Sequence, residues 1–233
     1  MCSLQSMSQY TNLVVFDLDG TLTDTTHVDE HAIVGALHDV LGVTGLSTDW
    51  SEYEHSTDAG IVHEVIQRER GTVSIDILHR VHDRCLEIME QFYTSSPDLF
   101  LPINGATDVL KRLTDANIAV AIATGSWRES ALFKLRVARI WRHQTIMATS
   151  DESQSRSEII SRAISQAAER YHQDGFQHIT YVGDGIWDAR ASRKLGLNFI
   201  GIASNGHAER LRAEGVDTIL HDLVDIGVLT GGV

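Results

Sequence analysis

Short apolar runs that alternate with stretches of helical periodicity constrain the fold of this 233-residue chain more than any other feature. Runs of strand length lie at residues 13–16, 118–123, 145–148, 179–182 and 199–202. Between them, residues 106–116 and 157–171 place apolar side chains on one face of a helix. Strands that alternate with helices are typical of a parallel sheet covered on both faces. We therefore predict an α/β fold with a parallel sheet at its core.

The connection between the first two strands is too long for an ordinary crossover, because it has about a hundred residues where about a dozen suffice. Strand-like alternation is scarce in it, whereas helical periodicity occurs at residues 29–41, 58–68 and 75–93. We predict a small helical cap, residues 25–100, inserted into a core that consists of residues 1–24 and 101–233.

Two linkers would join this cap to the core. The chain's only two prolines, Pro97 and Pro102, lie where the cap returns to the core, and their fixed φ angles would stiffen a hinge there. The outgoing linker, residues 23–26, is short and polar. The cap could then move as a body over the C-terminal edge of the sheet. A static helical extension is the alternative that the sequence leaves open.

The bulk composition limits the partners of the chain. A net charge of −13 and a pI near 5.3 argue against binding to the phosphate backbone of nucleic acids. Cys2 and Cys85 are too few for a disulfide framework or a cysteine metal cluster. No apolar run approaches the length of a membrane span, and the first residues lack the pattern of a signal peptide. We expect a cytoplasmic protein that binds neither nucleic acid nor membranes.

The first apolar run leads directly into two carboxylates and a glycine, Asp17-Leu18-Asp19-Gly20. Open α/β sheets bind ligands at the carboxyl ends of their strands, which is where this pair would lie. A metal ion can hold one such carboxylate ionised as a nucleophile while the other exchanges protons. A surface turn or a calcium loop could have the same short motif. The calcium loop is disfavoured because Val28 stands where its final glutamate is required.

With this motif the chain resembles the haloacid dehalogenase-like hydrolase superfamily, whose first motif is Asp-x-Asp-Gly-Thr after the first strand. Its second motif, a hydrophobic strand closed by Thr or Ser, matches the run that ends in Thr124-Gly125-Ser126. The hydroxyl of Thr124 and the backbone amide of Gly125 could both donate to phosphoryl oxygens.

The third motif is a basic residue that precedes a helix, and Arg156 occupies that place where most relatives have lysine. A guanidinium can neutralise both a phosphoryl group and the nucleophile. Two other basic residues fit less well, since Arg162 lies too far into the helix and Lys134 lies near the wrong strand.

The fourth motif is Gly-Asp-x-x-x-Asp, which the chain matches at Asp184 and Asp188. Carboxylates four residues apart at the start of a helix project to one side of it. Asp184 could reach a metal directly, and Asp188 could act through water or orient another ligand. Acidic residues that merely cap a helix N-terminus are the alternative.

Together the four motifs imply a Rossmann-like core with an inserted helical cap and a magnesium-dependent phosphatase resembling phosphoglycolate phosphatases and beta-phosphoglucomutases. By this resemblance Asp17 attacks phosphorus, Asp19 is the acid and base, and an aspartyl-phosphate forms. Mg²⁺ would be bound by Asp17, Asp184 and the backbone carbonyl of Asp19. Thr124, Gly125 and Arg156 would bind the phosphoryl oxygens of a small phosphorylated metabolite.

Single residues argue for or against the other activities found in similar proteins. Dehalogenating and phosphonate-cleaving relatives generally lack the acid that Asp19 provides. The latter also use a cap lysine, and residues 26–100 contain no lysine. A non-catalytic descendant would be expected to have lost a carboxylate, whereas all four aspartates of the motifs are present. A sugar-phosphate mutase keeps both aspartates of the first motif and stays open as the alternative.

Several features of the cap and its surroundings have no assigned role. Seven histidines lie in the cap without the spacing of a metal site, and we expect them on exposed helix faces. His63 and the neighbouring Thr57 and Asp58 could face the site. Trp187, inside the fourth motif, could form a wall of the site or pack against the sheet.

Overall fold

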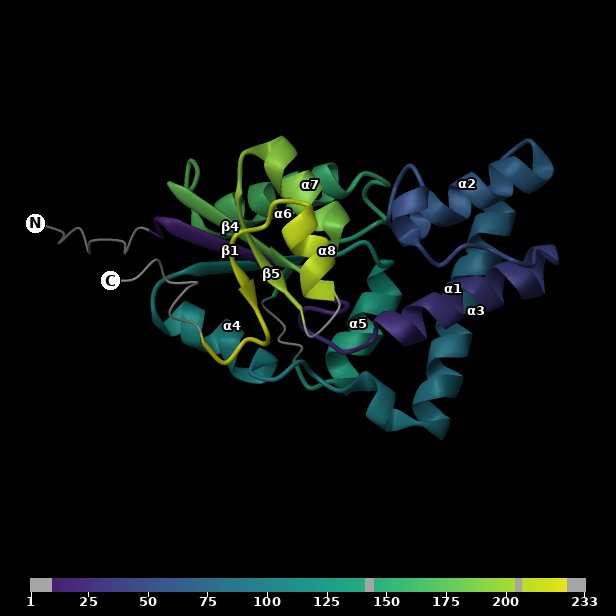
Figure 1. The fold of residues 1–233 in the computed structure, drawn as a ribbon, viewed down its shortest axis with the longest axis horizontal. Helices are drawn as coiled ribbons and strands as arrows, with labels where there is room; N and C mark the ends of the chain where they lie inside the picture. The colour runs from purple at the N-terminus through teal and green to yellow at the C-terminus, as the bar shows by residue number, and fades with distance from the viewer. Residues whose placement is uncertain (1–9, 141–144, 204–206, 226–233) are drawn as a thin grey trace, which may run out of the picture.

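A six-stranded parallel sheet forms the centre of the protein in the computed structural model, which describes residues 10–140, 145–203 and 207–225 (Figure 1). Its strands lie in the order β3-β2-β1-β4-β5-β6. They are β1 (Asn12–Phe16), β2 (Ala119–Ala123), β3 (Ile146–Ala148), β4 (His178–Gly183), β5 (Asn198–Ile202) and β6 (Ile219–Leu220). The prediction of an α/β fold with a parallel sheet is confirmed. The two-residue strand β6 at the edge was not predicted.

The register of the central strands brings three chain segments together at one edge of the sheet. Phe16 at the end of β1 pairs with Ile122 on β2 and with Val182 on β4. The residues that follow these strands are therefore neighbours in space although they are far apart in the sequence. This edge carries three of the four predicted motifs.

Helices cover both faces of the sheet because the side chains of each strand alternate between the faces. Val14 and Phe16 of β1 pack in one cluster with α4 (Ala106–Asp115) and α5 (Arg128–Val137). Leu13 and Val15 pack in another with α6 (Arg156–Tyr171) and α7 (Ile186–Leu195). The helix α8 (His207–Ala213) packs on α7 and β5.

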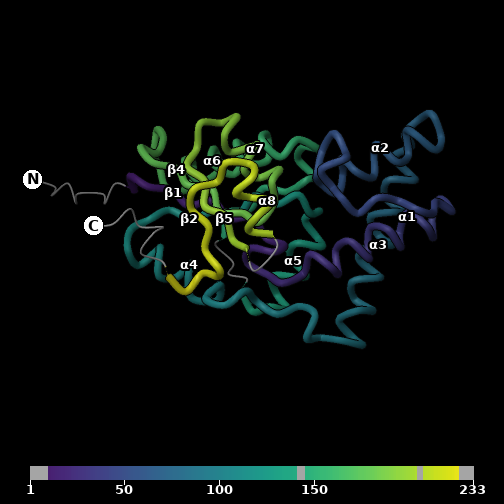
Figure 2. Tube along the Cα trace, viewed as in Figure 1, coloured from purple at the N-terminus to yellow at the C-terminus, as the bar shows by residue number. Residues whose placement is uncertain are grey.

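The long insert forms a helical layer with a hydrophobic cluster of its own, and we call residues 25–100 the cap. It contains α1 (Thr26–Leu41), η1 (Trp50–Glu52), α2 (Asp58–Arg70), α3 (Ile75–Ser95) and η2 (Pro97–Phe100). In the trace of Figure 2 the chain leaves β1, passes through these helices and returns to α4. Trp127, at the start of α5, packs into the same cluster and so joins the cap to the core.

The two linkers between cap and core lie side by side and bond to each other. The Asp24 amide donates to the Leu101 carbonyl at 2.9 Å, and the Ile103 amide donates to the Leu22 carbonyl at 2.9 Å. Pro102 pairs with Thr23 in an isolated antiparallel bridge between these bonds. Pro97 begins the short helix η2 instead. The two linkers thus form a hydrogen-bonded pair, and hinge motion of the cap stays a prediction.

None of the helices in the described part of the chain combines the length and the hydrophobicity that a bilayer span requires.

Candidate active site

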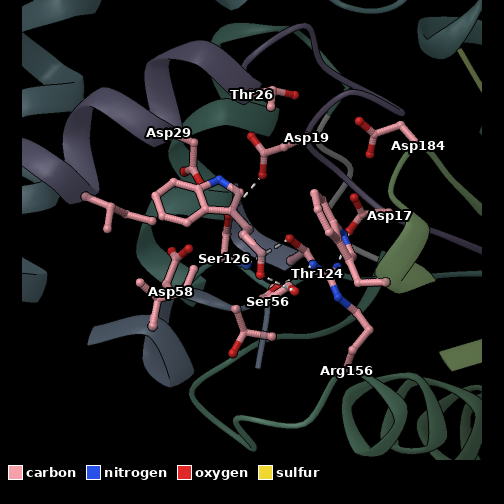
Figure 3. Close-up of a pocket in the computed structure, with 16 residues that line it drawn as sticks. Asp17, Asp19, Thr26, Asp29, Ser56, Asp58, Thr124, Ser126, Arg156 and Asp184 are labelled. Atoms are coloured by element: carbon pink, nitrogen blue, oxygen red, sulfur yellow. Dashed lines mark hydrogen bonds and ion pairs between the residues drawn. The ribbon is translucent and has the colours of Figure 1, made fainter. Parts of the chain in front are cut away.

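A pocket between the sheet edge and the cap gathers the residues of all four motifs (Figure 3). From the core it is lined by Asp17, Asp19, Thr124, Gly125, Ser126, Arg156, Asp184 and Trp187. From the cap it is lined by Thr26, Asp29, Ile33, Trp50, Ser56, Thr57, Asp58 and Ile61. The position is the one where open α/β sheets bind their ligands.

Asp17 lines this pocket and is held by the backbone and by one cation. Its amide donates to the Val182 carbonyl at 2.8 Å, which extends the pairing of β1 and β4 by one residue. Nη1 of Arg156 lies 2.8 Å from Oδ1 of Asp17. Burial, together with the charge of Asp188, raises the pKa of Asp17 well above its usual range, and Arg156 opposes this shift. The positive charge of Arg156 therefore does not fully offset the cost of burying this carboxylate beside another.

Arg156, the first residue of α6, connects the nucleophile candidate with the cap. Its Nη1 contacts Asp17, while its Nη2 donates to the Ser56 carbonyl at 2.9 Å. The guanidinium passes directly over Gly125, where a Cβ atom would lie 2.6 Å from Nη2. Any larger residue at position 125 would thus push the guanidinium away. The basic residue of the third motif reaches the site despite being arginine.

Three carboxylates form an acidic cluster, which consists of Asp17, Asp184 and Asp188 and has ligand oxygens within 4.8 Å of one another. Burial, with the charge of Asp17 next, raises the pKa of Asp184 well above its usual range. Asp188 accepts hydrogen bonds from the Gly185 amide at 3.0 Å and the Tyr181 hydroxyl at 3.2 Å. An all-oxygen set of this kind suits a hard divalent cation such as Mg²⁺. A cation would also offset the negative charge that burial leaves uncompensated.

Asp188 lies closer to the candidate metal site than the sequence suggested. Asp188 offers an oxygen to the same group as Asp17 and Asp184, although Nη1 of Arg156 also lies 3.5 Å from it. The carboxylate of Asp19 is not a member of this group. Metal binding by the Asp19 backbone carbonyl stays a prediction.

The close approach of Asp184 depends on Gly20 in the first motif. Gly20 has φ +74°, and a Cβ atom at this position would lie 2.1 Å from Oδ2 of Asp184. Both the left-handed backbone and the missing side chain are needed. The glycine of the first motif is therefore a packing partner of the fourth.

Asp19, two residues after Asp17, lies in a different hydrogen-bond network. Its carboxylate accepts from the Thr25 hydroxyl at 2.5 Å and from the Ser126 hydroxyl at 2.9 Å. Nζ of Lys134 lies 2.8 and 2.7 Å from its two oxygens. The two carboxylates of the first motif consequently have separate partners.

Lys134 is the main residue of the site that no motif of the sequence indicates, because it lies near the wrong strand for the third motif and outside the other three. Its Nζ also contacts Asp29 of the cap and the Ser126 hydroxyl, each at 2.7 Å. The signal was its position on α5, where Ser130, Ala131, Lys134 and Leu135 are the buried face of the helix. A lysine on the buried face of a helix needs a partner of opposite charge.

Most of the remaining candidate residues line the pocket. Thr124 is buried, and its Oγ1 accepts the Ser126 amide at 3.0 Å. Thr57 and Asp58 line the pocket as the sequence suggested, whereas His63 is not among the residues that line it. Trp187 is part of the wall and also packs partly against the cap cluster.

Comparison with known proteins gives the same fold. The model of the family described as haloacid dehalogenase-like hydrolase matches residues 14–202. A hydrolase from Pseudomonas syringae has a TM-score of 0.71 at 21% identity, covering 95% of this chain and 99% of that one. A provisional beta-phosphoglucomutase from Bacteroides vulgatus has a TM-score of 0.69 at 18% identity, covering 98% and 90%. CbbY from Rhodobacter sphaeroides, in complex with phosphate, has a TM-score of 0.64 at 18% identity, covering 93% and 96%.

No curated protein matches the chain. The family model nevertheless spans most of it, and the sheet carries the family's motifs at its carboxyl edge. The chain belongs to the haloacid dehalogenase-like hydrolases, and the resemblance inferred from the four motifs is confirmed.

Proposed function

We propose that this protein is a magnesium-dependent phosphatase that hydrolyses a small phosphorylated metabolite through an aspartyl-phosphate on Asp17. The observation that carries the proposal is the arrangement around Asp17. One oxygen of its carboxylate is held by Arg156 at 2.8 Å, and Asp17 shares the acidic cluster with Asp188 and with Asp184, which also lines the pocket. A nucleophile, a cation for phosphoryl oxygens and a metal-binding group thus meet at one point.

In the first half-reaction the substrate is held by its phosphoryl oxygens. Arg156, the Thr124 hydroxyl and the Gly125 amide, which belong to residues that line the pocket, would bind them. A carboxylate oxygen of Asp17 forms a bond to phosphorus as the bond to the leaving oxygen breaks. Asp19 gives its proton to that oxygen, so that an alcohol leaves.

In the second half-reaction water takes the place of the alcohol. Asp19, now ionised, removes a proton from the water as its oxygen attacks phosphorus. The bond between phosphorus and Asp17 breaks, and inorganic phosphate and the free carboxylate result. Asp19 regains the proton that it needs for the next turnover.

Asp17, Asp184 and Asp188 would hold the magnesium ion. When bound, the ion offsets the repulsion between an anionic nucleophile and an anionic substrate. The raised pKa values of Asp17 and Asp184 support this assignment, since buried carboxylates without enough positive charge near them are what such an ion would stabilise.

The cap side of the pocket favours a phosphatase over a sugar-phosphate mutase. A mutase must also bind its substrate by a second phosphate, which calls for a cation away from the nucleophile. Among the described residues that line the pocket, those of the cap include Asp29 and Asp58 but no lysine, arginine or histidine. We infer a substrate with one phosphoryl group and an uncharged or cationic remainder.

Product analysis tests this function. Purified protein incubated with single phosphomonoesters and with sugar phosphates should release inorganic phosphate with Mg²⁺ and should form no isomerised sugar phosphate. Removal of the metal with a chelator should stop the release, and Asp17→Asn should abolish it with the fold retained, as judged by circular dichroism. Isomerised sugar phosphate as the main product would contradict the proposal, as would near-normal activity of the variant.

A further inference from the structure

Lys134 is a fully buried cation whose donors are all used inside the active site. Its side chain is 0% exposed. An ammonium has three N–H donors, and the contacts of Nζ go to three residues, Asp19, Ser126 and Asp29, at distances of 2.7 to 2.8 Å. All three partners line the pocket. The lysine therefore belongs to the site rather than to a surface ion-pair network.

The surroundings of Lys134 keep it positively charged. Burial by itself would lower its pKa, but the carboxylates of Asp19, Asp29 and Asp58 outweigh burial and raise the pKa above its ordinary value. A buried ammonium is stable only where it is paired in this way. The chain thus places a paired ammonium beside the carboxylate for which we propose proton exchange.

The contact between Lys134 and Asp19 restricts the side chain of Asp19. Thr25 and Ser126 each donate to one oxygen of that carboxylate, whereas Nζ of Lys134 lies within hydrogen-bond distance of both. Ser126 is itself held by Lys134 at 2.7 Å. Two of the three partners of Asp19 therefore depend on the position of the ammonium.

The same ammonium connects Asp19 with the cap. Its third partner, Asp29, lies in the first turn of α1, a few residues beyond the outgoing linker. Lys134 itself lies on α5 of the core. The carboxylate of Asp19 is thereby tied, through one cation, to the helix with which the cap begins.

We propose that Lys134 is a positioning residue for the general acid: it holds the carboxylate of Asp19 toward the leaving oxygen and couples that orientation to the first turn of α1 through Asp29. The inference rests on the proposed function, because it needs Asp19 to act as acid and base. Lys134 makes no bond to phosphorus or to the leaving group in this account.

Substrates whose leaving groups differ in basicity can distinguish a positioning role of Lys134 from a structural one. An alkoxide must be protonated as it leaves, whereas a nitrophenolate leaves without help. The value of kcat/KM reports only the steps up to the loss of the leaving group, so it isolates the acid role of Asp19 from its later role as base. 4-Nitrobenzyl phosphate and 4-nitrophenyl phosphate have nearly the same shape and differ in this property.

The experiment compares Lys134→Met with the wild type on both substrates in the presence of Mg²⁺. We expect kcat/KM to fall by about 100-fold for the nitrobenzyl ester and by less than about threefold for the nitrophenyl ester, because a positioned acid contributes at least that much to alkoxide departure. Lys111→Met is the matched control, since Lys111 is exposed and forms an ion pair with Asp115 outside the active site. The Lys111→Met variant should leave kcat/KM unchanged for both esters.

A charge-balanced variant excludes a purely structural explanation. Lys134→Met leaves buried carboxylates without their cation, and it can weaken folding for that reason. The double variant Lys134→Met with Asp29→Asn removes one negative charge as well, yet it lacks the positioning donor. It should fold and still lose activity selectively on the nitrobenzyl ester.

Three outcomes would overturn the inference. They are equal losses on the two esters, no loss on either, or recovery of both values in the double variant. Failure of the proposed function is distinguishable, because the wild-type protein itself would then release no phosphate from either ester.

Discussion

At the scale of single residues, the two aspartates of the first motif have opposite surroundings although one residue separates them. Asp17 contacts Arg156 and belongs to the acidic cluster, where we propose that a metal and a phosphoryl group bind. Asp19 faces hydroxyl groups and an ammonium. Their different partners agree with the roles proposed for them, attack on phosphorus for the first and proton transfer for the second.

Gly20 offers the sharpest residue-scale prediction, because a Cβ atom there would lie 2.1 Å from Oδ2 of Asp184. Gly20→Ala should displace Asp184 from the acidic cluster. We expect the Mg²⁺ concentration for half-maximal phosphate release to rise by about tenfold or more, the usual cost of disturbing a metal ligand. A titration of activity with Mg²⁺ measures this.

Gly42→Ala is the matched control for backbone strain. Gly42 has φ +75°, almost the value of Gly20, but a Cβ atom there meets nothing within 4 Å. This variant should lose some stability without any change in its Mg²⁺ requirement. Equal Mg²⁺ requirements in the two variants would show that the contact with Asp184 is unimportant.

The residues that the sequence predicted and those it missed differ in how local their signals are. Asp17, Asp184 and Arg156 lie in short motifs at strand ends or a helix start, which are visible in a single stretch of chain. Lys134 acquires its role from Asp19, 115 residues away, and from Asp29, 105 residues away. Such pairings follow from the packing of α5 against the cap, which no local pattern contains.

At the scale of elements, the start of α2 is where the cap meets the core. The Thr57 hydroxyl donates to the Gln154 carbonyl at 2.8 Å and accepts the Gly60 amide as the N-cap of α2. The next residue, Asp58, bonds to the Gly125 carbonyl through its amide and to the Trp127 amide through its side chain. One helix end therefore docks on the loops that carry two motifs.

Thr57→Ala tests this docking contact. The variant loses both the N-cap and the bond to Gln154, so we expect the free energy of unfolding to fall by about 1–2 kcal/mol. Because the cap then closes less firmly over the pocket, KM should rise more than kcat falls. Chemical denaturation and steady-state kinetics give the two quantities.

Thr57→Ser keeps the hydroxyl and should behave almost like the wild type. If Thr57→Ala loses stability without any change in KM, the contact is a helix cap only and has no part in closing the site.

The elements themselves were largely predictable, since five of the six strands and the main helices have clear periodicity. The edge strand β6, residues Ile219–Leu220, was missed because two residues cannot establish an alternation. The pairing of the two linkers was also invisible, because it depends on Leu22 and Leu101 lying side by side.

At the scale of the whole molecule, the fold gathers buried charge at one edge of the sheet and covers it with the cap. Asp17, Asp184 and Asp188 come from two segments that the parallel register of β1 and β4 brings together. Burying so many carboxylates costs stability unless a cation and a phosphoryl ligand make use of them. The proposed binding of a cation and a phosphoryl group explains why the fold buries these carboxylates at one edge of the sheet.

The most direct test of the account is to find the phosphoryl group on Asp17. Asp19→Asn should slow hydrolysis of the intermediate, while 4-nitrophenyl phosphate can still form it because its leaving group needs no acid. After mixing with Mg²⁺ and rapid acid quenching, mass spectrometry should locate a phosphoryl adduct on Asp17. Phosphate release by the wild type together with an adduct on another residue, or with none in this variant, would contradict the account.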